Sequence, residues 1–544
     1  MALDYEKFKK ERISGTKINP FHMITAVTQR AINNQLTKMH KVNPTLRKLT
    51  LNSPDPDDDY SALEADLDPP TIELRLNTEN RIVIFCFNIK RATLKYLKVK
   101  GRKVLEETMV LPSCVLALSV NLTFEGVDFK DLPKDIQNRL KVINDYSVRQ
   151  LLVDFTSASL ARLDKQRTTI QDHIDDPNAQ ANFNIFMEKY FTMLAERKND
   201  TVLHYLPLAT TEGRKQYAMP TVPPTDFTFQ NLPFVISATD NGMPSDDNML
   251  VYLQMTGNVP IPRELLPISA NWVVPTPDNT DRYDGTVALS REIFLAGWLL
   301  PKLAEFNKRS SYVVTDAWWK STGIGLTTRY FLDGHLGRDD ATTEELLFKP
   351  VEADKMNQAV LQALKPETPG RWYQYKFNSS KDDNKGLWRV WHTGATDNYM
   401  FIPEGYNKDG KCEILLTGTT LIRFYVHVDI PSSTGWVEGK WSTSIILDGI
   451  NDGELQIKIG DINPQINQSV DEAWLHKGEI THFSNPAKEG MRRLSMTYLL
   501  NEMRNVFTDG WDFVLPGAGD FYIHKAVFNR EEDLLCELKY KFQA

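Results

Sequence analysis

Long runs of residues typical of β-strands occupy much of this chain and constrain its fold more than any other feature. Residues 81–89, 110–124 and 413–429 are rich in β-branched and aromatic side chains, with turn-forming residues between such runs. Residues 71–76 alternate between apolar and polar side chains, as in a strand with one buried face. The pattern predicts an α+β protein built mostly from antiparallel sheets.

The length of 544 residues exceeds what one hydrophobic core usually serves, so two or three domains are expected. The order of the patterns is a helix plus sheet, a mixed middle, and then more sheet with a helix. We therefore predict three blocks, 1–234, 235–370 and 371–544, and two sheet-plus-helix units among them. An apolar fraction of 41% is enough to form their cores.

An apolar stripe at steps of three and four residues predicts an amphipathic helix from 20 to 41, with one face buried. The stripe includes Phe21, Ile24, Val27, Ile32 and Leu36.

Helical spacing recurs in five other segments, and two further segments read as irregular. In the segment 289–308, Pro301 is expected to kink or divide the helix. The predicted helices are 136–159, 181–197, 289–308, 355–364 and 490–507. The acidic stretch 53–70 is predicted to be an exposed loop, and 207–233 a connector or an edge segment.

Four scattered cysteines without a Cys-x-x-Cys pair argue against a zinc knuckle and a disulfide framework, so free thiols are expected. The net charge is −8 and basic residues form no block, which disfavours nucleic acid as a partner. The first twelve residues are charged, and no stretch approaches the ~20 apolar residues of a membrane span. A cytoplasmic protein without an integral membrane segment is expected.

The segment from Gly405 to Cys412 resembles a phosphate-binding loop but has cysteine in place of the serine or threonine that would hold magnesium. A strand follows it, where such a loop requires a helix. A hairpin turn is therefore favoured over nucleotide binding.

His476, Glu479 and His482 have a spacing that suggests a zinc site, although a metalloprotease helix separates its histidines by four residues. An exposed loop or edge strand is the favoured interpretation. We predict no catalytic residue, no cofactor site and no metal site from the sequence, and an enzyme is less expected than a binding protein.

Three ordered segments resemble the forty-seven-kilodalton companion protein family of clostridial neurotoxin gene clusters. They are 248–262 with 270–275, then 289–307, and finally the C-terminal stretch that includes 510–513, 516–522 and 533–535. The resemblance covers about a third of the chain and rests on aromatic and glycine-turn patterns.

This resemblance implies the tubular lipid-binding fold, in which strongly curved antiparallel sheets wrap around long helices and leave an apolar groove. It implies a non-enzymatic protein that binds a lipid or another hydrophobic small molecule, and possible service as an accessory of a toxin-like or secondary-metabolite gene cluster. The stripe of Phe21, Ile24, Val27, Ile32 and Leu36 is the predicted groove lining.

Two alternatives of other classes stay open. The chain could be a scaffold whose exposed sheets bind a protein partner across an interface of about 1,200 Å² or more. It could instead be a cyclase or isomerase acting on a hydrophobic metabolite, which requires acidic or basic side chains that converge in a deep pocket.

Overall fold

A computed structural model describes most of the chain between residues 5 and 540. The ranges outside the described part are 1–4, 77–80, 133, 135–136, 138–145, 198–200, 210–223, 236–244, 267–270, 275–282, 322–327, 429–431, 452–453, 474–478, 501–520 and 541–544.

The chain divides into two compact units, and each is assembled from segments that are distant in sequence. Unit 1 consists of 1–288, 509–524 and 536–544, and unit 2 consists of 289–508 and 525–535. The three predicted blocks divide the chain elsewhere, and that division stays a prediction. The expected α+β class with mostly antiparallel, strongly curved sheets and two sheet-plus-helix units is confirmed.

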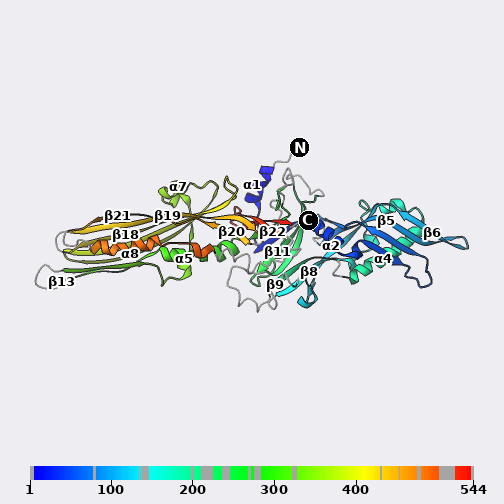
Figure 1. The fold of residues 1–544 in the computed structure, drawn as a ribbon, viewed down its shortest axis with the longest axis horizontal. Helices are drawn as coiled ribbons and strands as arrows, with labels where there is room; N and C mark the ends of the chain where they lie inside the picture. The colour runs from blue at the N-terminus through cyan, green and yellow to red at the C-terminus, as the bar shows by residue number, and fades with distance from the viewer. Residues whose placement is uncertain are drawn as a thin grey trace. The chain divides into compact units, whose positions relative to one another are not determined.

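Unit 1 contains a curved antiparallel sheet with the order β2-β3-β5-β7-β8-β9, in which β4 and β6 also pair with β5. The long helix α4 (Pro177–Glu196) lies along it (Figure 1) and contacts β2, β3 and β5. The strands are β2 (Lys48–Asn52), β3 (Ala62–Leu67), β4 (Thr71–Leu74), β5 (Ile82–Lys100), β6 (Lys103–Leu111), β7 (Cys114–Val127), β8 (Tyr146–Asp154) and β9 (Val202–Ala209).

The predicted helix at 20–41 is wrong in its first part. Met23–Thr28 forms strand β1, and helix α2 begins only at Gln29 and ends at Val42. All six residues of β1 are buried, so strand alternation does not show in its composition. Thr28 ends the strand and caps the helix, because its hydroxyl oxygen accepts a hydrogen bond of 3.2 Å from the Ala31 N–H.

Strand β1 belongs to a six-stranded sheet with the order β10-β11-β1-β12-β23-β22. The segment 207–233, predicted as a connector or an edge segment, contains the end of β9 and the strand β10. Strand β10 lies at one edge of the six-stranded sheet, and the residues between β9 and β10 lie outside the described part. Helix α1 (Tyr5–Gly15) precedes the sheet in sequence. The other strands of this six-stranded sheet are β10 (Pro224–Leu232), β11 (Met249–Thr256), β12 (Gly285–Leu289), β22 (Phe521–Phe528) and β23 (Leu534–Tyr540).

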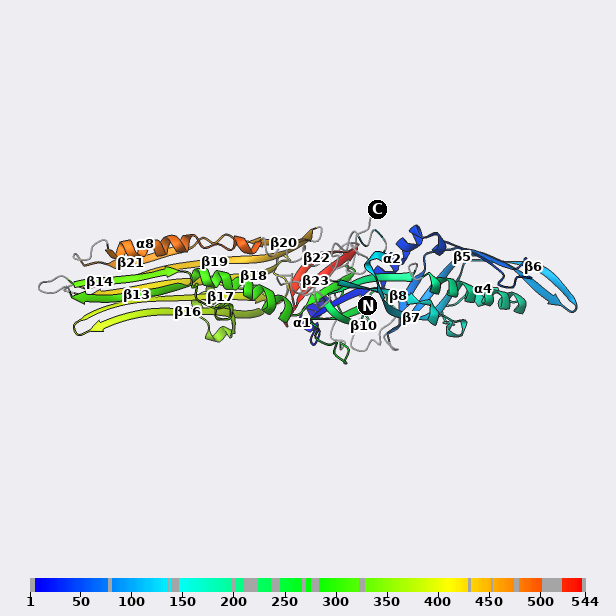
Figure 2. The same cartoon turned by 90° about the horizontal axis from the view of Figure 1, so that it is seen from below.

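Unit 2 contains a sheet with the order β15-β16-β17-β18-β19-β20, and β21 also pairs with β19. The neighbours β16 to β19 run side by side as long antiparallel strands (Figure 2). A separate hairpin consists of β13 (Tyr312–Ser321) and β14 (Thr328–Leu336). The sheet strands are β15 (Lys349–Val351), β16 (Gly370–Lys385), β17 (Trp388–Pro403), β18 (Cys412–His427), β19 (Ser433–Asn451), β20 (Glu454–Ile459) and β21 (Gln465–Asp471).

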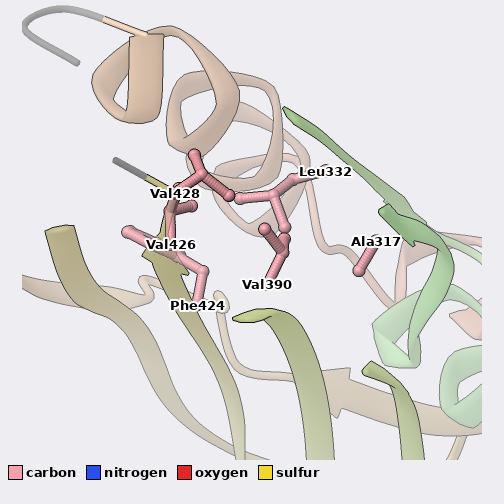
Figure 3. Packing of buried hydrophobic residues seen from close by; sticks show 6 residues of the cluster. All are labelled: Ala317, Leu332, Val390, Phe424, Val426 and Val428. Atoms are coloured by element: carbon pink, nitrogen blue, oxygen red, sulfur yellow. The ribbon is translucent and has the colours of Figure 1, made fainter. Parts of the chain in front are cut away.

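One core cluster of unit 2 joins this hairpin to the inner face of the sheet. Figure 3 shows Ala317 and Leu332 of the hairpin facing Val390, Phe424 and their neighbours. Phe424 and Val390 are each 0% exposed, so alternate residues of β17 and β18 turn inward as the sequence pattern requires.

The helices of unit 2 follow the predictions in part. As expected, the segment 289–308 is divided: a π-helical segment, η8 (Glu292–Leu299), is followed by α5 (Leu300–Ser310), and Pro301 lies in the first turn of α5. The predicted helix 355–364 corresponds to α7 (Gln358–Leu364). The predicted helix 490–507 is wrong at its start, because α8 (Glu479–Arg492) ends there. A short helix, α6, spans Thr343–Leu346.

Two segments of unit 1 also differ from prediction. Residues 62–67, expected within an acidic loop, form β3, and the acidic residues Glu64 and Asp66 face solvent between buried neighbours. Residues 146–154 form β8 where a helix was predicted: the strand lies between β7 and β9, and its residues from Gln150 to Val153 are all buried. The segment 181–197 is helical, as predicted.

Candidate functional site

Helix α4 of unit 1 is held at its N-terminus by a polar cap. The Asp176 carboxylate accepts a 3.0 Å hydrogen bond from the Asn178 N–H, and Pro177 occupies the first helical turn. The same carboxylate contacts the Lys98 ammonium of β5 at 2.6 Å. The lysine and the cap hydrogen bonds hold the pKa of Asp176 well below its usual range. The cap thus ties the helix to the sheet.

The inner face of α4 packs its aromatic residues against aromatic residues from the sheet. The Phe87 ring lies 5.5 Å from the Tyr190 ring and 5.9 Å from the Phe191 ring, centroid to centroid. Phe155 meets the Phe85 ring edge-on at 5.2 Å. These distances are those of favourable aromatic pairs. The cluster forms the apolar floor of the space between the helix and the sheet.

A small enclosed cavity lies above this floor and holds about 20 Å³ of free space, room for about one water molecule. Most of its lining side chains are apolar, and Asp68 is the ionisable acid among them. The lining residues are Leu36, Leu46, Leu67, Asp68, Pro70, Phe85, Phe87, Asn88, Val153, Phe155, Tyr190, Leu194 and Thr201.

A wider cleft of about 390 Å³ adjoins the cavity and is open to solvent. Tyr190 and Leu194 of α4 line both spaces, so these two side chains form the wall between them. Two exposed cations, Lys48 of β2 and Arg197 at the end of α4, lie at the cleft. The other lining residues are Pro44, Leu49, Thr50 and Met193. A volume of this size is typical of small-molecule sites.

Of the predicted groove residues, Leu36 of α2 lines the enclosed cavity. Phe21, Ile24, Val27 and Ile32 are each at most 1% exposed, and none of them belongs to the linings of the cavity or the cleft. The structure therefore does not bring the five together at one described site.

The sequence pattern missed most of the lining for identifiable reasons. Tyr190 and Leu194 lie on the apolar stripe of the predicted helix 181–197, and Phe85 and Phe87 lie in the predicted strand 81–89, so each had a structural signal. Nothing local indicates that these two segments face each other. Phe155 fell within a segment predicted to be helical.

The phosphate-loop look-alike is a turn that leads into a strand, as predicted. Asn407 Oδ1 accepts hydrogen bonds from the Asp409 and Lys411 N–H groups at 3.1 and 3.0 Å, and β18 begins at Cys412. His476 lies outside the described residues, and the predicted loop or edge strand is wrong for Glu479 and His482, which belong to helix α8. Within the described part of the chain, no group of three or more histidine, cysteine or acidic side chains is placed to hold a metal ion.

A buried histidine in unit 1 makes the stability of the fold dependent on pH. His204 of β9 is 1% exposed and its ring packs edge-on against Tyr252 at 5.9 Å. Burial disfavours the charged ring and lowers the pKa of His204 to about 3. Because the unfolded chain binds this proton near pH 6.5 and the folded chain only near pH 3, stability is lost as the pH falls between these values.

We expect the free energy of unfolding to fall by about 2 kcal/mol between pH 7 and pH 5 through His204. His204→Phe should remove that part of the decline, since the ring site is apolar. Urea unfolding followed by circular dichroism at both pH values measures it. His173→Gln removes an exposed histidine and is the control. An unchanged acid decline in His204→Phe would contradict the assignment.

The fold and the site together define a class: a protein of two curved-sheet units, in which one unit holds an apolar cavity beside an open cleft. No helix of the described residues is long and apolar enough to cross a membrane.

No family model and no curated protein matches the chain. Among solved structures it is similar to P47 of Clostridium botulinum E1, with 11% identity and a TM-score of 0.44 over 96% of this chain and 99% of that chain. Three segments of the sequence resemble the forty-seven-kilodalton companion family, to which P47 belongs. A lipopolysaccharide binding protein matches with 9% identity and a TM-score of 0.29 over 96% of this chain and 100% of that chain.

Proposed function

We propose that unit 1 binds a hydrophobic ligand whose apolar chain occupies the space between α4 and the curved sheet. The observation that carries the proposal is the apolar cavity next to an open cleft, separated by the side chains of Tyr190 and Leu194. The cleft gives access from solvent, and the cavity gives an apolar interior.

The ligand must displace side chains, because the enclosed cavity holds only about 20 Å³ of free space. Burying an acyl chain contributes about 0.8 kcal/mol per methylene, which offsets the cost of moving a few side chains once several methylenes are buried. Helix α4 therefore acts as the adjustable wall of the site.

The cations at the cleft suggest the chemistry of the polar end of the ligand. Lys48 and Arg197 are exposed and lie beside Leu194, so an acidic head group in the cleft would meet positive charge. We propose a fatty acid or another acidic amphiphile with a single chain.

Extraction of the purified full-length chain with organic solvent, followed by mass spectrometry, should release such a ligand. Leu194→Trp fills the cavity wall and is expected to weaken binding of a fluorescent fatty acid by at least about tenfold, because overpacking removes the space for the chain. Ile185→Trp adds the same bulk to an exposed position, 46% exposed, of the same helix and should leave the affinity unchanged.

Leu194→Ala provides a second measurement that does not depend on how well the tryptophan variant folds. It enlarges the cavity and should strengthen binding, whereas Ile185→Ala should not. A full-length chain that releases no lipid and shows no saturable fatty-acid binding would end the proposal.

The accessory role in a toxin-like or secondary-metabolite gene cluster, the cytoplasmic location and a protein partner also belong to the proposal. Their support is the sequence resemblance and the sequence composition. The isomerase or cyclase alternative has less support at this site, because Asp68 is the one acidic side chain among the residues that line the cavity and the cleft.

A further inference from the structure

The hairpin of β5 and β6 ends in a tip that combines exposed apolar and basic side chains. It extends past α4 at the end of unit 1 (Figures 1 and 2). Lys100 pairs with Lys103 across a two-residue turn, and Gly101 adopts φ 66° there. A positive φ at the first central turn position suits glycine and matches the twist of a two-residue hairpin.

The apolar residues at the tip are far more exposed than is usual for their type. Val99 and Val104 pair directly across the strands, and each is 62% exposed. Leu105, next to Val104, is 37% exposed. Within the described sheet β6 pairs only with β5, so no other strand covers this apolar pair. These three side chains are contiguous, and contiguous exposed apolar side chains are typical of interaction surfaces.

The charge at the tip is opposite in sign to that of the whole chain. Residues 95–107 hold five cations and two acids, a net charge of 5 − 2 = +3, whereas the chain carries −8. Lys98 is engaged by Asp176. Lys100, Arg102 and Lys103 are exposed, and within the described part of the chain none of them forms an ion pair.

Charges on an edge hairpin also discourage strand pairing between molecules. That role accounts for the lysines but not for a pair of exposed valines at the same tip, since exposed apolar side chains promote association. The combination therefore requires a partner that offers negative charge and a hydrocarbon phase together.

We propose that the tip of the β5–β6 hairpin docks on the surface of an anionic phospholipid bilayer. The hairpin would lie with its Val99–Val104 face against the boundary of the acyl chains, and the long side chains of Lys100, Arg102 and Lys103 at the turn would reach the phosphates. Protein interfaces are instead depleted of lysine, and their main anchors are tryptophan, tyrosine and arginine. The inference goes beyond ligand binding in the cavity and does not depend on it.

Flotation of the full-length chain with vesicles tests the proposal. The chain should bind phosphatidylcholine vesicles that contain about 30 mol% phosphatidylserine, and not phosphatidylcholine alone, and the binding should weaken as salt rises. Reversal of Lys100, Arg102 and Lys103 to glutamate should reduce binding by at least about a hundredfold, since each cation contributes about fivefold. Val99→Ser with Val104→Ser should reduce it by about tenfold at unchanged charge.

The matched control reverses Lys349, Lys355 and Lys381, three exposed lysines of unit 2, and changes the net charge equally. It should keep most of the binding. Leu194→Trp should also keep it, which separates this test from that of the cavity. If the reversal variant fails to fold, the corresponding glutamine variant decides.

Equal binding by the hairpin and control variants would overturn the proposal, as would an absence of binding. Binding to heparin as strong as that to vesicles, with no effect of the valine changes, would indicate an acidic macromolecule and would also overturn it.

Discussion

Glu532→Ala is expected to lower the free energy of unfolding of unit 2 by about 1.5–3 kcal/mol, because it leaves the buried Tyr373 hydroxyl and the partly exposed guanidinium groups of Arg291 and Arg371 without their carboxylate. The Glu532 side chain is 3% exposed and lies 2.8 Å from Arg291 Nε and 3.2 Å from Arg371 Nη1. The Tyr373 hydroxyl donates a 2.7 Å hydrogen bond to it. Together these contacts tie the turn between β22 and β23 to the sheet of unit 2.

Tryptophan fluorescence during urea unfolding measures this loss, since nine of the eleven tryptophans lie in the segments of unit 2. Glu531→Ala is the matched control. Its side chain is 46% exposed and 3.9 Å from Arg371, so a change of at most about 0.5 kcal/mol is expected. Equal effects of the two substitutions would show that burial of Glu532 does not govern its contribution.

Arg12→Met is expected to destabilise unit 1 by about 3–5 kcal/mol, the cost of breaking an ion pair that is buried on both sides. The Arg12 side chain is 3% exposed and lies 3.9 Å from Glu537. Its guanidinium donates hydrogen bonds to the Trp272 carbonyl at 3.3 Å and to the Thr286 hydroxyl at 3.2 Å. One side chain of α1 thus joins three segments of unit 1.

Hydrogen exchange of unit 1 peptides measures the effect. Lys9→Met, on the same helix but 57% exposed, should change stability by at most about 0.5 kcal/mol. The double variant Arg12→Met with Glu537→Leu should recover part of the loss, because an apolar pair often replaces a buried ion pair without penalty. A double variant less stable than Arg12→Met alone would contradict this account.

The strands of unit 2 were the most predictable part of the fold. Residues 413–429 alternate regularly, and β18 follows that pattern with every second side chain buried. The period of two is visible because one face of this sheet is covered and the other is more exposed.

Strands were not predicted where complete burial or charged residues removed the two-residue alternation of apolar and polar side chains. Strand β1 is buried on both faces, and its apolar residues matched the helical spacing that continues into α2. Strand β3 carries two acids on its outer face, so its composition suggested a loop. The contacts that decide β1 come from β11 and β12, which are distant in sequence, whereas β3 is decided by pairing with its neighbours β2 and β5, and local propensity contains neither.

For the candidate site, the sequence predicted an apolar space between a helix and a sheet but few of the residues that line it. A helix against a curved sheet implied an apolar interior, and of the five residues proposed as groove lining Leu36 lies at the cavity. Tyr190 and Leu194 face the cleft because of the way α4 is rotated about its axis where it packs on β2 and β5. Tertiary packing determines that rotation.

The assembly of unit 1 from both ends of the sequence has a consequence for biosynthesis. Arg12 leaves the ribosome early, and its partner Glu537 emerges more than five hundred residues later. Until then a buried cation of the first helix lacks its counter-charge, and strand β23 is missing from its sheet. At a translation rate of about 5–20 residues per second, unit 1 stays incomplete for roughly half a minute or longer. During this interval its apolar surfaces would be accessible to chaperones.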